Sequence, residues 1–450
     1  MKKNTCPKSA QTHQSRVLLL LLLFLLVAMA FWLLLKGDRK HARLERRDLA
    51  QRPTWRWASV ADGSWMKGVE SWLQDQFWGR EQWLRLETFM DLGLGAGDNG
   101  RVYFGRNGRL FLYETAQGIA DKTGQREALF ADNVEELARF FATTLPEAMV
   151  GRPLQSQVLM LVPPAAAVLP EGLPVGAVPW SLPLAEKVVQ SKLDGLPVTR
   201  LDVWQALCGE GTGATSGVKT ARETLGEADA QGAGQEADAQ TLNPKRARVE
   251  REAFFLKTDH HWTSLGAWQA AQAYVAALDL PVNRAEDYEA ELVTTDFAGS
   301  LAARAPGLAG QEAFAVYRPT DAAVKKGRHR DPRSVRQWGL GGQVQAQGLY
   351  VPEALQGEDP YLYQLGDYAA FTRIQGGPAN HRHLLLVRDS FGNAFLPAVV
   401  DAFETIDIVD PRHGEPKISS LLAQTTYTDV LLLYSYSQLA TDESFYRLND

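Results

Sequence analysis

The feature that most constrains how this 450-residue chain can fold is an unbroken apolar run near its amino end. Residues 17–35 are all apolar and are flanked by Arg16 and Lys36. A run of this length can cross the hydrocarbon core of a bilayer as one helix. The sequence therefore predicts a membrane anchor, with the rest of the chain folding outside the bilayer.

The alternative to an anchor is a cleaved signal peptide. Residues 28–30, Ala-Met-Ala, have the small-x-small form of a cleavage site. However, an apolar stretch follows them where a polar one would be expected, which favours an uncleaved anchor. The chain then divides into a cytoplasmic tail (1–16), the transmembrane anchor (17–35), a juxtamembrane linker (36–65) and a main domain (66–450).

Charge and cysteine content narrow the function of the main domain. Residues 1–50 carry ten Lys or Arg against three acidic residues, whereas the remainder carries 37 against 50. An acidic body argues against nucleic-acid binding, which needs a basic surface to neutralise phosphates. The two cysteines, Cys6 and Cys208, lie on opposite sides of the anchor and therefore cannot form a disulfide.

The segment after the anchor is rich in tryptophan. We expect a helix over residues 66–90 whose apolar side chains form a broad face. Such an aromatic stripe can pack against the main domain, lie at the membrane interface or line a sugar site, and packing is the commonest of these. Residues 101–113 then alternate and turn at Asn107-Gly108, which predicts a β-hairpin.

From residue 157 the pattern becomes one of alternating strands and helices. Strands are predicted at residues 158–162, 198–203, 384–388, 405–409 and 430–434, and helices at 184–193 and 418–424. This alternation is typical of an α/β fold with a parallel sheet flanked by helices. In such a fold, functional sites lie at the carboxyl ends of the strands.

Two segments interrupt the α/β plan. Residues 209–250 lack apolar periodicity, which predicts a disordered insertion, with a lid as the alternative. Residues 284–380 contain short β-like runs and predict an elaboration beside the sheet. Within it, residues 325–336 are rich in Lys and Arg. A solvated loop is the commoner explanation, and attraction of an acidic polysaccharide is the alternative.

The strand at residues 384–388 ends in a sequence that suits nucleophilic chemistry. Ser390 follows it, and apolar residues at helical spacing come next, so the serine is expected at a strand-to-helix turn. Free N–H groups at the start of a helix can stabilise an oxyanion there. The alternative interpretation is that Asp389 or Ser390 is only a helix N-cap.

A second strand-turn-helix unit is predicted from residue 253 onward. Its turn carries an Asp-His-His-Trp string at residues 259–262, and Thr263 is the expected N-cap of the helix. Asp259 and His261 lie on the same side of the chain only if this turn is extended. His260 is then expected to face away from them.

These motifs together resemble a known family. The Asp-His-His-Trp string, the Arg-Asp-Ser-Phe-Gly-Asn string at residues 388–393 and the Ile-Val-Asp-Pro-Arg string at residues 408–412 are similar to those of the DHHW family. They are also similar to the alginate O-acetyltransferase accessory proteins, and residues 75–80 and 102–111 extend the likeness. The resemblance implies an SGNH-hydrolase-like domain.

The resemblance further implies a catalytic triad of Ser390, His261 and Asp259, in permuted order relative to ordinary SGNH enzymes. His261 would take the proton from Ser390, and Asp259 would orient His261 and stabilise its imidazolium. The implied reaction is acyl transfer through an acyl-serine, to a sugar hydroxyl in an O-acetyltransferase or to water in an esterase. Asn393 is the candidate oxyanion donor, with an ordinary first-turn polar residue as the alternative. We expect no cofactor and no metal.

Partners and location also follow from the resemblance. The family acts on exported polymers, which places the main domain in the periplasm or the extracellular space. The basic residues flanking the anchor would by themselves place it in the cytoplasm, but long domains translocate largely regardless of flanking charge. The expected partners are a polysaccharide acceptor and a membrane-bound O-acyltransferase that donates acetyl groups.

Two other functions fit the same residues. A metal-dependent hydrolase could draw oxygen and nitrogen ligands from residues 259–261 together with His381 and His383. A non-catalytic polysaccharide-binding or scaffold protein of the same export system would keep the fold without turnover.

Overall fold

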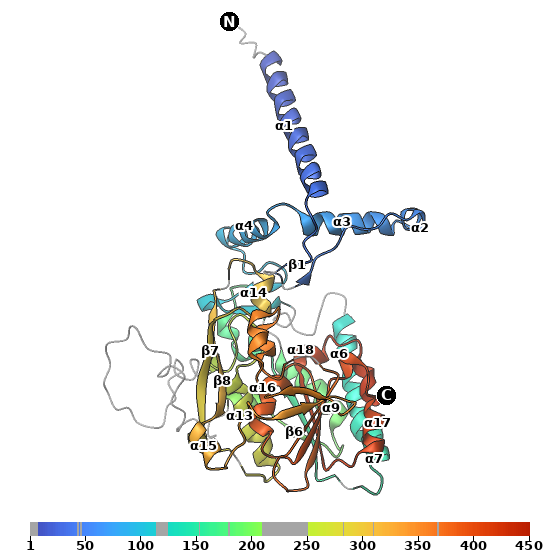
Figure 1. Ribbon diagram of the computed structural model, residues 1–450, viewed down its shortest axis with the longest axis vertical. Helices are drawn as coiled ribbons and strands as arrows, with labels where there is room; N and C mark the ends of the chain where they lie inside the picture. Colours follow the sequence, from blue (N-terminus) through green and yellow to red (C-terminus); the bar gives the residue numbers. More distant parts are fainter. Residues whose placement is uncertain are drawn as a thin grey trace, which may run out of the picture. The chain divides into compact units, whose positions relative to one another are not determined.

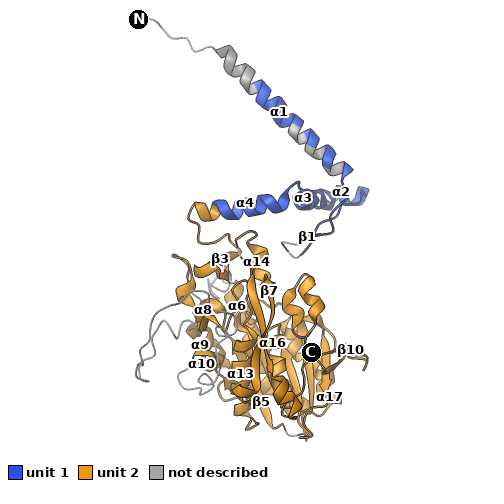
Figure 2. Cartoon of the chain, turned by 60° about the vertical axis from the view of Figure 1, so that its left-hand side comes forward, with its two compact units in different colours: residues 1–90 blue, residues 91–450 orange. Residues whose placement is uncertain are grey.

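A computed structural model of the protein describes residues 8–450 apart from positions 43–44, 46, 114–124, 153, 179–180, 209–250, 282, 309 and 367–368. The insertion expected at residues 209–250 therefore lies outside the described residues. The chain divides into two compact units, residues 1–90 and 91–450, which are considered separately (Figure 2).

The first unit contains the apolar run and the tryptophan-rich segment (Figure 1). Its elements are α1 (Lys8–Leu35), β1 (His41–Ala42), β2 (Arg47–Asp48), α2 (Trp57–Ala61), α3 (Ser64–Gln76) and most of α4 (Arg80–Gly93). Across the described residues, no helix combines the length and the apolar character needed to cross a membrane. The anchor at residues 17–35 stays a prediction.

The helix expected over residues 66–90 is two helices, so this expectation was wrong. Helix α3 ends at Gln76, and Gly79 adopts a φ of 66°, a left-handed conformation that glycine accepts without steric cost. The break is held by polar contacts of α3, because Asp75 accepts hydrogen bonds from Arg47 Nη1 at 2.9 Å and from the Ala50 N–H at 2.8 Å.

The second unit is built on an eight-stranded sheet with the order β10-β9-β11-β13-β12-β14-β5-β6. Its strands are β5 (Ser156–Val162), β6 (Thr199–Leu201), β9 (Arg336–Trp338), β10 (Val344–Gln347), β11 (Phe371–Gln375), β12 (His383–Arg388), β13 (Thr405–Val409) and β14 (Asp429–Ser435).

The sheet is mixed, whereas the sequence predicted a parallel one. Strands β13, β12, β14, β5 and β6 pair in parallel, as predicted. Strands β11, β9 and β10 extend the β13 edge in antiparallel pairs. These added strands come from residues 336–375. A short connection joins β9 to β10, so the chain returns beside the preceding strand and the pair is antiparallel.

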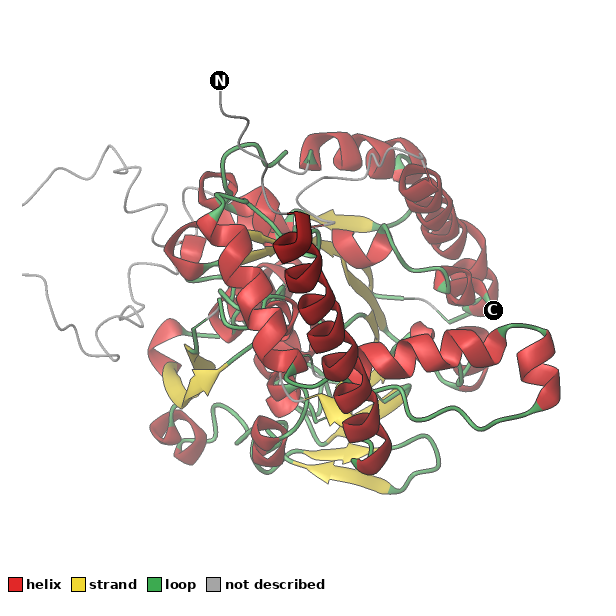
Figure 3. Ribbon diagram, turned by 90° about the horizontal axis from the view of Figure 1, so that it is seen from above, coloured by secondary structure: helices red, strands yellow, loops and turns green. Residues whose placement is uncertain are grey.

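The central strands are buried on both faces, which explains their continuous runs of Leu and Val. Helices α13 (Ser264–Ala277) and α16 (Gly392–Val399) pack against one face, and α6 (Gln125–Arg139), α9 (Leu182–Leu193) and α17 (Ile418–Gln424) pack against the other (Figure 1). Figure 3 distinguishes the helices, in red, from the strands, in yellow. Alternate β12 residues serve the two cores, with Leu384 and Leu386 on the α13 side and Leu385 and Val387 on the α6 side.

The remaining elements lie around this sheet. The hairpin of β3 (Val102–Phe104) and β4 (Leu110–Leu112) is confirmed, and Asn107 and Gly108 both have positive φ, as its turn requires. The other elements are β7 (Tyr288–Phe297), β8 (Glu312–Pro319), α7 (Leu145–Ala148), α8 (Ala165–Val168), α10 (Val203–Cys208), α14 (Ser300–Arg304), α15 (Asp321–Lys325), α18 (Tyr436–Leu439), a π-helical segment (Phe140–Thr144) and 3-10 turns that include η5 (Pro352–Gln356) and η6 (Pro360–Tyr363).

Three of the six Lys and Arg residues in the basic loop at residues 325–336 pair with carboxylates. Arg328 pairs with Asp287, and Arg330 Nε lies 3.0 Å from Asp401 Oδ1. Arg333 Nε lies 3.0 Å from Asp331 Oδ1. These pairs support the solvated-loop explanation over the attraction of an acidic polymer.

Candidate active site

Three side chains from two distant segments meet at the carboxyl end of β12. Asp259 Oδ1 lies 2.6 Å from His261 Nδ1, and His261 Nε2 lies 2.7 Å from Ser390 Oγ. Both distances are those of hydrogen bonds. The structure therefore brings together the residues predicted as a triad, in the order that serine catalysis requires.

The turn after β12 is organised by Asp389. Its Oδ1 accepts a hydrogen bond from the Phe391 N–H at 3.0 Å, and its Oδ2 accepts one from the Ser435 N–H at 2.7 Å. Helix α16 has Phe391 as its N-cap and no side-chain cap, so neither Asp389 nor Ser390 is the N-cap that the sequence left open. The hydroxyl of Ser390 remains available to pair with His261.

Burial and hydrogen bonding have opposite effects on the pKa of the Asp389 carboxyl. The carboxyl is almost completely buried, and burial raises its pKa above the usual range, although the charge of Arg412 and the bonds from Ser435 and Phe391 oppose this shift. A buried carboxyl is tolerated when its oxygens are satisfied by donors. Asp389 therefore works as a rigid acceptor that ties the serine turn to β14.

The segment that carries Asp259 and His261 is a tight turn closed by backbone contacts. Phe255 and Trp262 form an isolated β-bridge, and the Leu256 N–H donates to the His261 carbonyl at 3.1 Å. The strand expected at residues 253–256 is thus only this bridge, because the chain turns back at once instead of joining the sheet. Thr263 caps α13 by accepting the Gly266 N–H at 3.2 Å, as predicted.

Asp259 is held as a carboxylate. Its Oδ1 accepts the His261 backbone N–H at 3.0 Å, and its Oδ2 accepts the Ser300 N–H at 2.6 Å. Burial alone would raise the pKa of Asp259, but the two neighbouring imidazoles and these donors outweigh burial and lower the pKa below its usual range. A charged Asp259 holds the proton on His261 Nδ1, which leaves Nε2 free to accept the serine proton.

His260 does not turn fully away from the site, in contrast to our expectation. Its Nδ1 lies 2.9 Å from Ser300 Oγ, and its ring centroid lies 3.9 Å from that of His261. Burial and the charge of His261 lower the pKa of His260 to about 3, so it is neutral at physiological pH. His260 therefore packs beside the triad without adding a charge.

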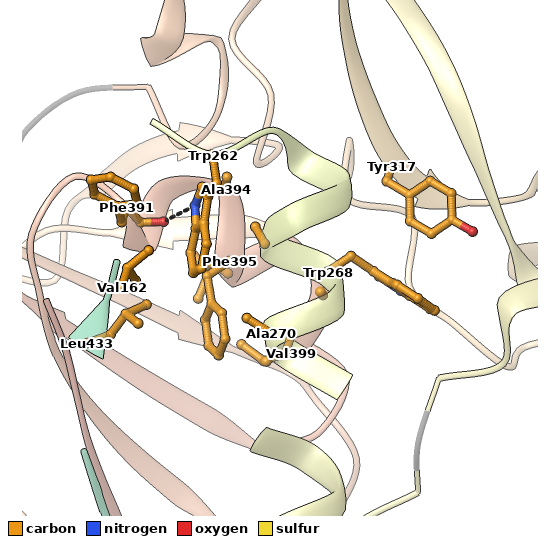
Figure 4. Packing of buried hydrophobic residues seen from close by; sticks show 14 of the residues in the cluster. Val162, Trp262, Trp268, Ala270, Tyr317, Phe391, Ala394, Phe395, Val399 and Leu433 are labelled. Atoms are coloured by element: carbon orange, nitrogen blue, oxygen red, sulfur yellow. Dashed lines mark hydrogen bonds between the residues drawn. The ribbon is translucent and has the colours of Figure 1, made fainter. Parts of the chain in front are cut away.

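Aromatic rings enclose His261. Tyr361, from η6, stacks on the imidazole with ring centroids 3.8 Å apart and an interplanar angle of 4°. The centroid of the Phe391 ring lies 4.9 Å from that of the His261 ring. Trp262 Nε1 donates to the Phe391 carbonyl at 3.0 Å (Figure 4). These contacts fix the plane of the His261 imidazole and connect the turns that precede α13 and α16. No sequence motif indicated Tyr361, which lies far from both motifs along the chain.

Two charged residues, buried Arg109 and half-buried Glu312, brace the Asp259 turn and were not predicted. Arg109, in the hairpin, donates from Nη1 to the Leu256 carbonyl at 2.8 Å and from Nη2 to the Glu252 carbonyl at 3.0 Å. The Glu312 carboxylate accepts the Lys257 N–H at 2.9 Å and the Thr258 N–H at 2.7 Å. The only sequence signal was that Arg109 lies within residues 102–111, which share the family likeness.

Asn393 lies one helical turn after Ser390. Its backbone N–H donates to the Ser390 carbonyl at 3.2 Å, and its side chain is fully buried. Within the described part of the chain, neither the Oδ1 nor the Nδ2 atom of this amide has a hydrogen-bond partner. A buried amide without partners is costly and calls for an explanation. One explanation is that the Asn393 amide binds an oxyanion, and this role stays a prediction.

The metal-site alternative is only partly assembled. Asp259, His260 and His261 each offer a ligand atom within 4.8 Å of the others. However, His381 and His383 lie at the amino end of β12, whereas the site lies beyond its carboxyl end. His381 is exposed, and His383 Nε2 lies 3.2 Å from Asp407 Oδ2. The five proposed ligands therefore do not converge.

The fold and the site together define a class, an α/β domain of the SGNH-hydrolase-like type with a serine at the carboxyl edge of its sheet. Residues 197–335 match the family described as SGNH hydrolase-like domain, acetyltransferase AlgX. The matched segment includes Asp259 and His261 and ends before Ser390. The resemblance that the motifs indicated is thus confirmed. No curated protein matches the sequence.

One solved structure, that of PatB1, supports the same fold. The chain is similar to Bacillus cereus PatB1 with a sulfonyl adduct, at 19% identity, over 76% of this chain and 97% of that chain, with a TM-score of 0.53. It is also similar to a DHHW family protein from Eubacterium siraeum (21% identity, 70% and 88% covered, TM-score 0.49) and to the O-acetyltransferase domain of Pseudomonas putida AlgJ (16% identity, 76% and 92% covered, TM-score 0.39).

Proposed function

We propose that this protein is a membrane-anchored serine O-acetyltransferase that modifies a hydroxyl of a cell-surface polysaccharide outside the cytoplasm. The observation that carries the proposal is the hydrogen-bonded chain from Asp259 through His261 to Ser390. The match to a family described as an acetyltransferase supports the choice of an acetyl group.

The first half of the reaction forms an acetyl-serine. As Ser390 Oγ attacks the carbonyl carbon of the acetyl donor, its proton passes to His261 Nε2. The resulting oxyanion is stabilised by the Asn393 side-chain amide, because the N–H groups of Phe391, Gly392 and Asn393 already donate to Asp389 and Ser390. The tetrahedral intermediate then expels the leaving group of the donor, which takes the proton from His261.

The second half transfers the acetyl group to the acceptor. His261 removes the proton of a sugar hydroxyl, whose oxygen attacks the acetyl-serine carbonyl. Collapse of this intermediate releases the acetylated sugar and returns the proton to Ser390. Water in place of the sugar hydroxyl would make the same residues an esterase.

The location and the donor follow from the proposed anchor. Residues 17–35 would hold the domain at the outer surface of the membrane, where acetyl-coenzyme A is not available. A membrane-bound O-acyltransferase that passes acetyl groups across the bilayer is therefore the proposed donor, and the polysaccharide is the acceptor.

Intact-mass spectrometry tests the nucleophile directly. Full-length protein in detergent is exposed to a small activated acetyl ester, beside Ser390→Ala, His261→Ala and the exposed control His381→Ala. We expect one acetyl adduct on Ser390 in the wild type and the control, and none in the other two. The absence of an adduct on folded wild-type protein would refute the proposal and favour the binding or scaffold function.

A second measurement separates transferase from esterase. The acetylated protein is mixed with oligosaccharides, and acetylated sugar and free acetate are measured. Acetyl transfer to a sugar supports the transferase. Release of acetate at a rate that no sugar changes would identify an esterase instead.

A further inference from the structure

The first unit exposes an apolar face that the proposed reaction does not use. Buried Thr88 marks the inner side of α4. Leu86 lies on the opposite side, and Leu86, Trp83, Phe89 and Met90 are between 46% and 56% exposed. The side of a helix that faces water is normally polar. This outward side of α4, called the α4 face below, instead carries four large apolar side chains.

Tryptophans extend the exposed apolar surface to the neighbouring elements. Trp55, Trp57 and Trp78 are between 55% and 78% exposed. Trp55 contacts Trp57 and Trp65 edge to face, with ring centroids 5.4 and 4.9 Å apart. Tryptophan is enriched where a bilayer meets water, because its ring is apolar and its N–H needs a polar partner.

The α4 face adjoins the end of α1. A cavity of about 560 Å³ is lined by Trp32 and Lys36 together with Trp78, Trp83 and Leu86. Lys36 Nζ lies 4.4 Å from the centroid of the Trp32 ring, which is a cation–π contact. A lysine and tryptophans beside the end of a long apolar run are typical of the headgroup level of a bilayer.

We infer that the α4 face binds the interface of a phospholipid bilayer, with Leu86 and Trp83 directed to the acyl chains and Lys36 to the phosphate groups. The inference rests on the membrane anchor of the proposed function. Continuity with α1 favours lipid as the occupant, since the bilayer that takes up the apolar run would also meet the α4 face. The helix would then lie in the membrane plane.

Spin labels on adjacent residues test this geometry. Full-length protein carrying Cys6→Ser and Cys208→Ser receives a nitroxide at Leu86→Cys or, as the matched control, at Glu87→Cys. Both proteins are reconstituted in phosphatidylethanolamine and phosphatidylglycerol vesicles. Collision with oxygen, which concentrates in lipid, is compared with collision with a water-soluble nickel complex. We expect oxygen to dominate at position 86 and nickel at position 87.

Three outcomes would overturn the inference and remain distinguishable. Vesicles that float with the protein but leave position 86 open to nickel would refute the α4 interface while retaining the anchor. Protein that does not float would refute both. Dipolar broadening between two labels at position 86 would assign the face to a second copy of the chain. Acetylation of Ser390, measured in detergent, tests the proposed chemistry independently of all three.

Discussion

The hairpin residue Arg109 should control the Asp259 turn from outside the triad. Its guanidinium donates four hydrogen bonds to the carbonyls of Glu252, Phe255 and Leu256, just before the catalytic turn. Arg109 is buried, and burial lowers its pKa below the ordinary value. We therefore choose Arg109→Met, which keeps an unbranched apolar stem and removes every donor.

The magnitude follows from the contacts. Three carbonyls lose a charged donor, and each loss costs about 1 kcal/mol or more when the group is buried. Removing the guanidinium also relieves the penalty of burying its charge, which offsets part of this loss. We expect the free energy of unfolding to fall by about 2–4 kcal/mol. The free energy of unfolding of Arg109→Lys should lie between those of the wild type and Arg109→Met, because one ammonium cannot reach all three carbonyls.

Guanidinium chloride unfolding followed by circular dichroism measures this effect, since the midpoint falls in proportion to lost stability at constant slope. The matched control is Arg106→Met, an exposed arginine in the same hairpin. Acetylation of Ser390 should slow in Arg109→Met and not in the control. Equal midpoints and equal rates for the two variants would refute the assigned role of Arg109.

Two further substitutions probe the surroundings of the site. Tyr361→Ala removes the ring stacked on His261 and should slow acetylation of Ser390, whereas Tyr361→Phe keeps the ring and should preserve the rate, as intact-mass time courses would show. Glu312→Gln weakens acceptance from the Lys257 and Thr258 N–H groups and should lower unfolding stability by about 1–2 kcal/mol. An unchanged denaturant midpoint would exclude this bracing role.

The parts of the fold that sequence predicts well are those with a local physical signal. Strand β13 coincides with the expected residues 405–409, and α17 coincides with 418–424. Both are set by apolar patterns within a few residues. The two segments that carry Asp259, His261 and Ser390 were likewise recognised from the sequence, because each contains a short motif between a β-type run and a helix.

The parts that were missed depend on contacts between distant segments. Strand β9 reads Arg-Gln-Trp, which does not alternate, and β10 reads Val-Gln-Ala-Gln, which alternates over only four residues with no large apolar side chain but Val344. Arg109, Glu312 and Tyr361 act on the site through contacts with residues that are distant along the chain, and such contacts leave no periodic pattern in the sequence. Only the folded sheet brings these residues beside Asp259 and His261.

The two buried carboxyls of the site predict opposite dependences of stability on pH. The pKa of Asp259 is lowered, so its stabilising contribution is present above the unfolded pKa of about 3.9 and is lost as pH falls. The pKa of Asp389 is raised, so its contribution is present at low pH and is lost as pH rises through the folded value.

Asparagine variants separate these contributions. Relative to wild type, Asp259→Asn should be most destabilised near neutral pH, and this difference should narrow as pH falls below about 4, near the unfolded pKa of a carboxyl. Asp389→Asn loses a hydrogen-bond acceptor at every pH, but it also avoids the cost of ionising a buried carboxyl. The difference in the free energy of unfolding between Asp389→Asn and wild type should therefore narrow as pH rises. Denaturant midpoints between pH 3 and pH 7 measure both. Parallel profiles would contradict the assignment of Asp259 as the charged partner of His261 and of Asp389 as the structural acceptor.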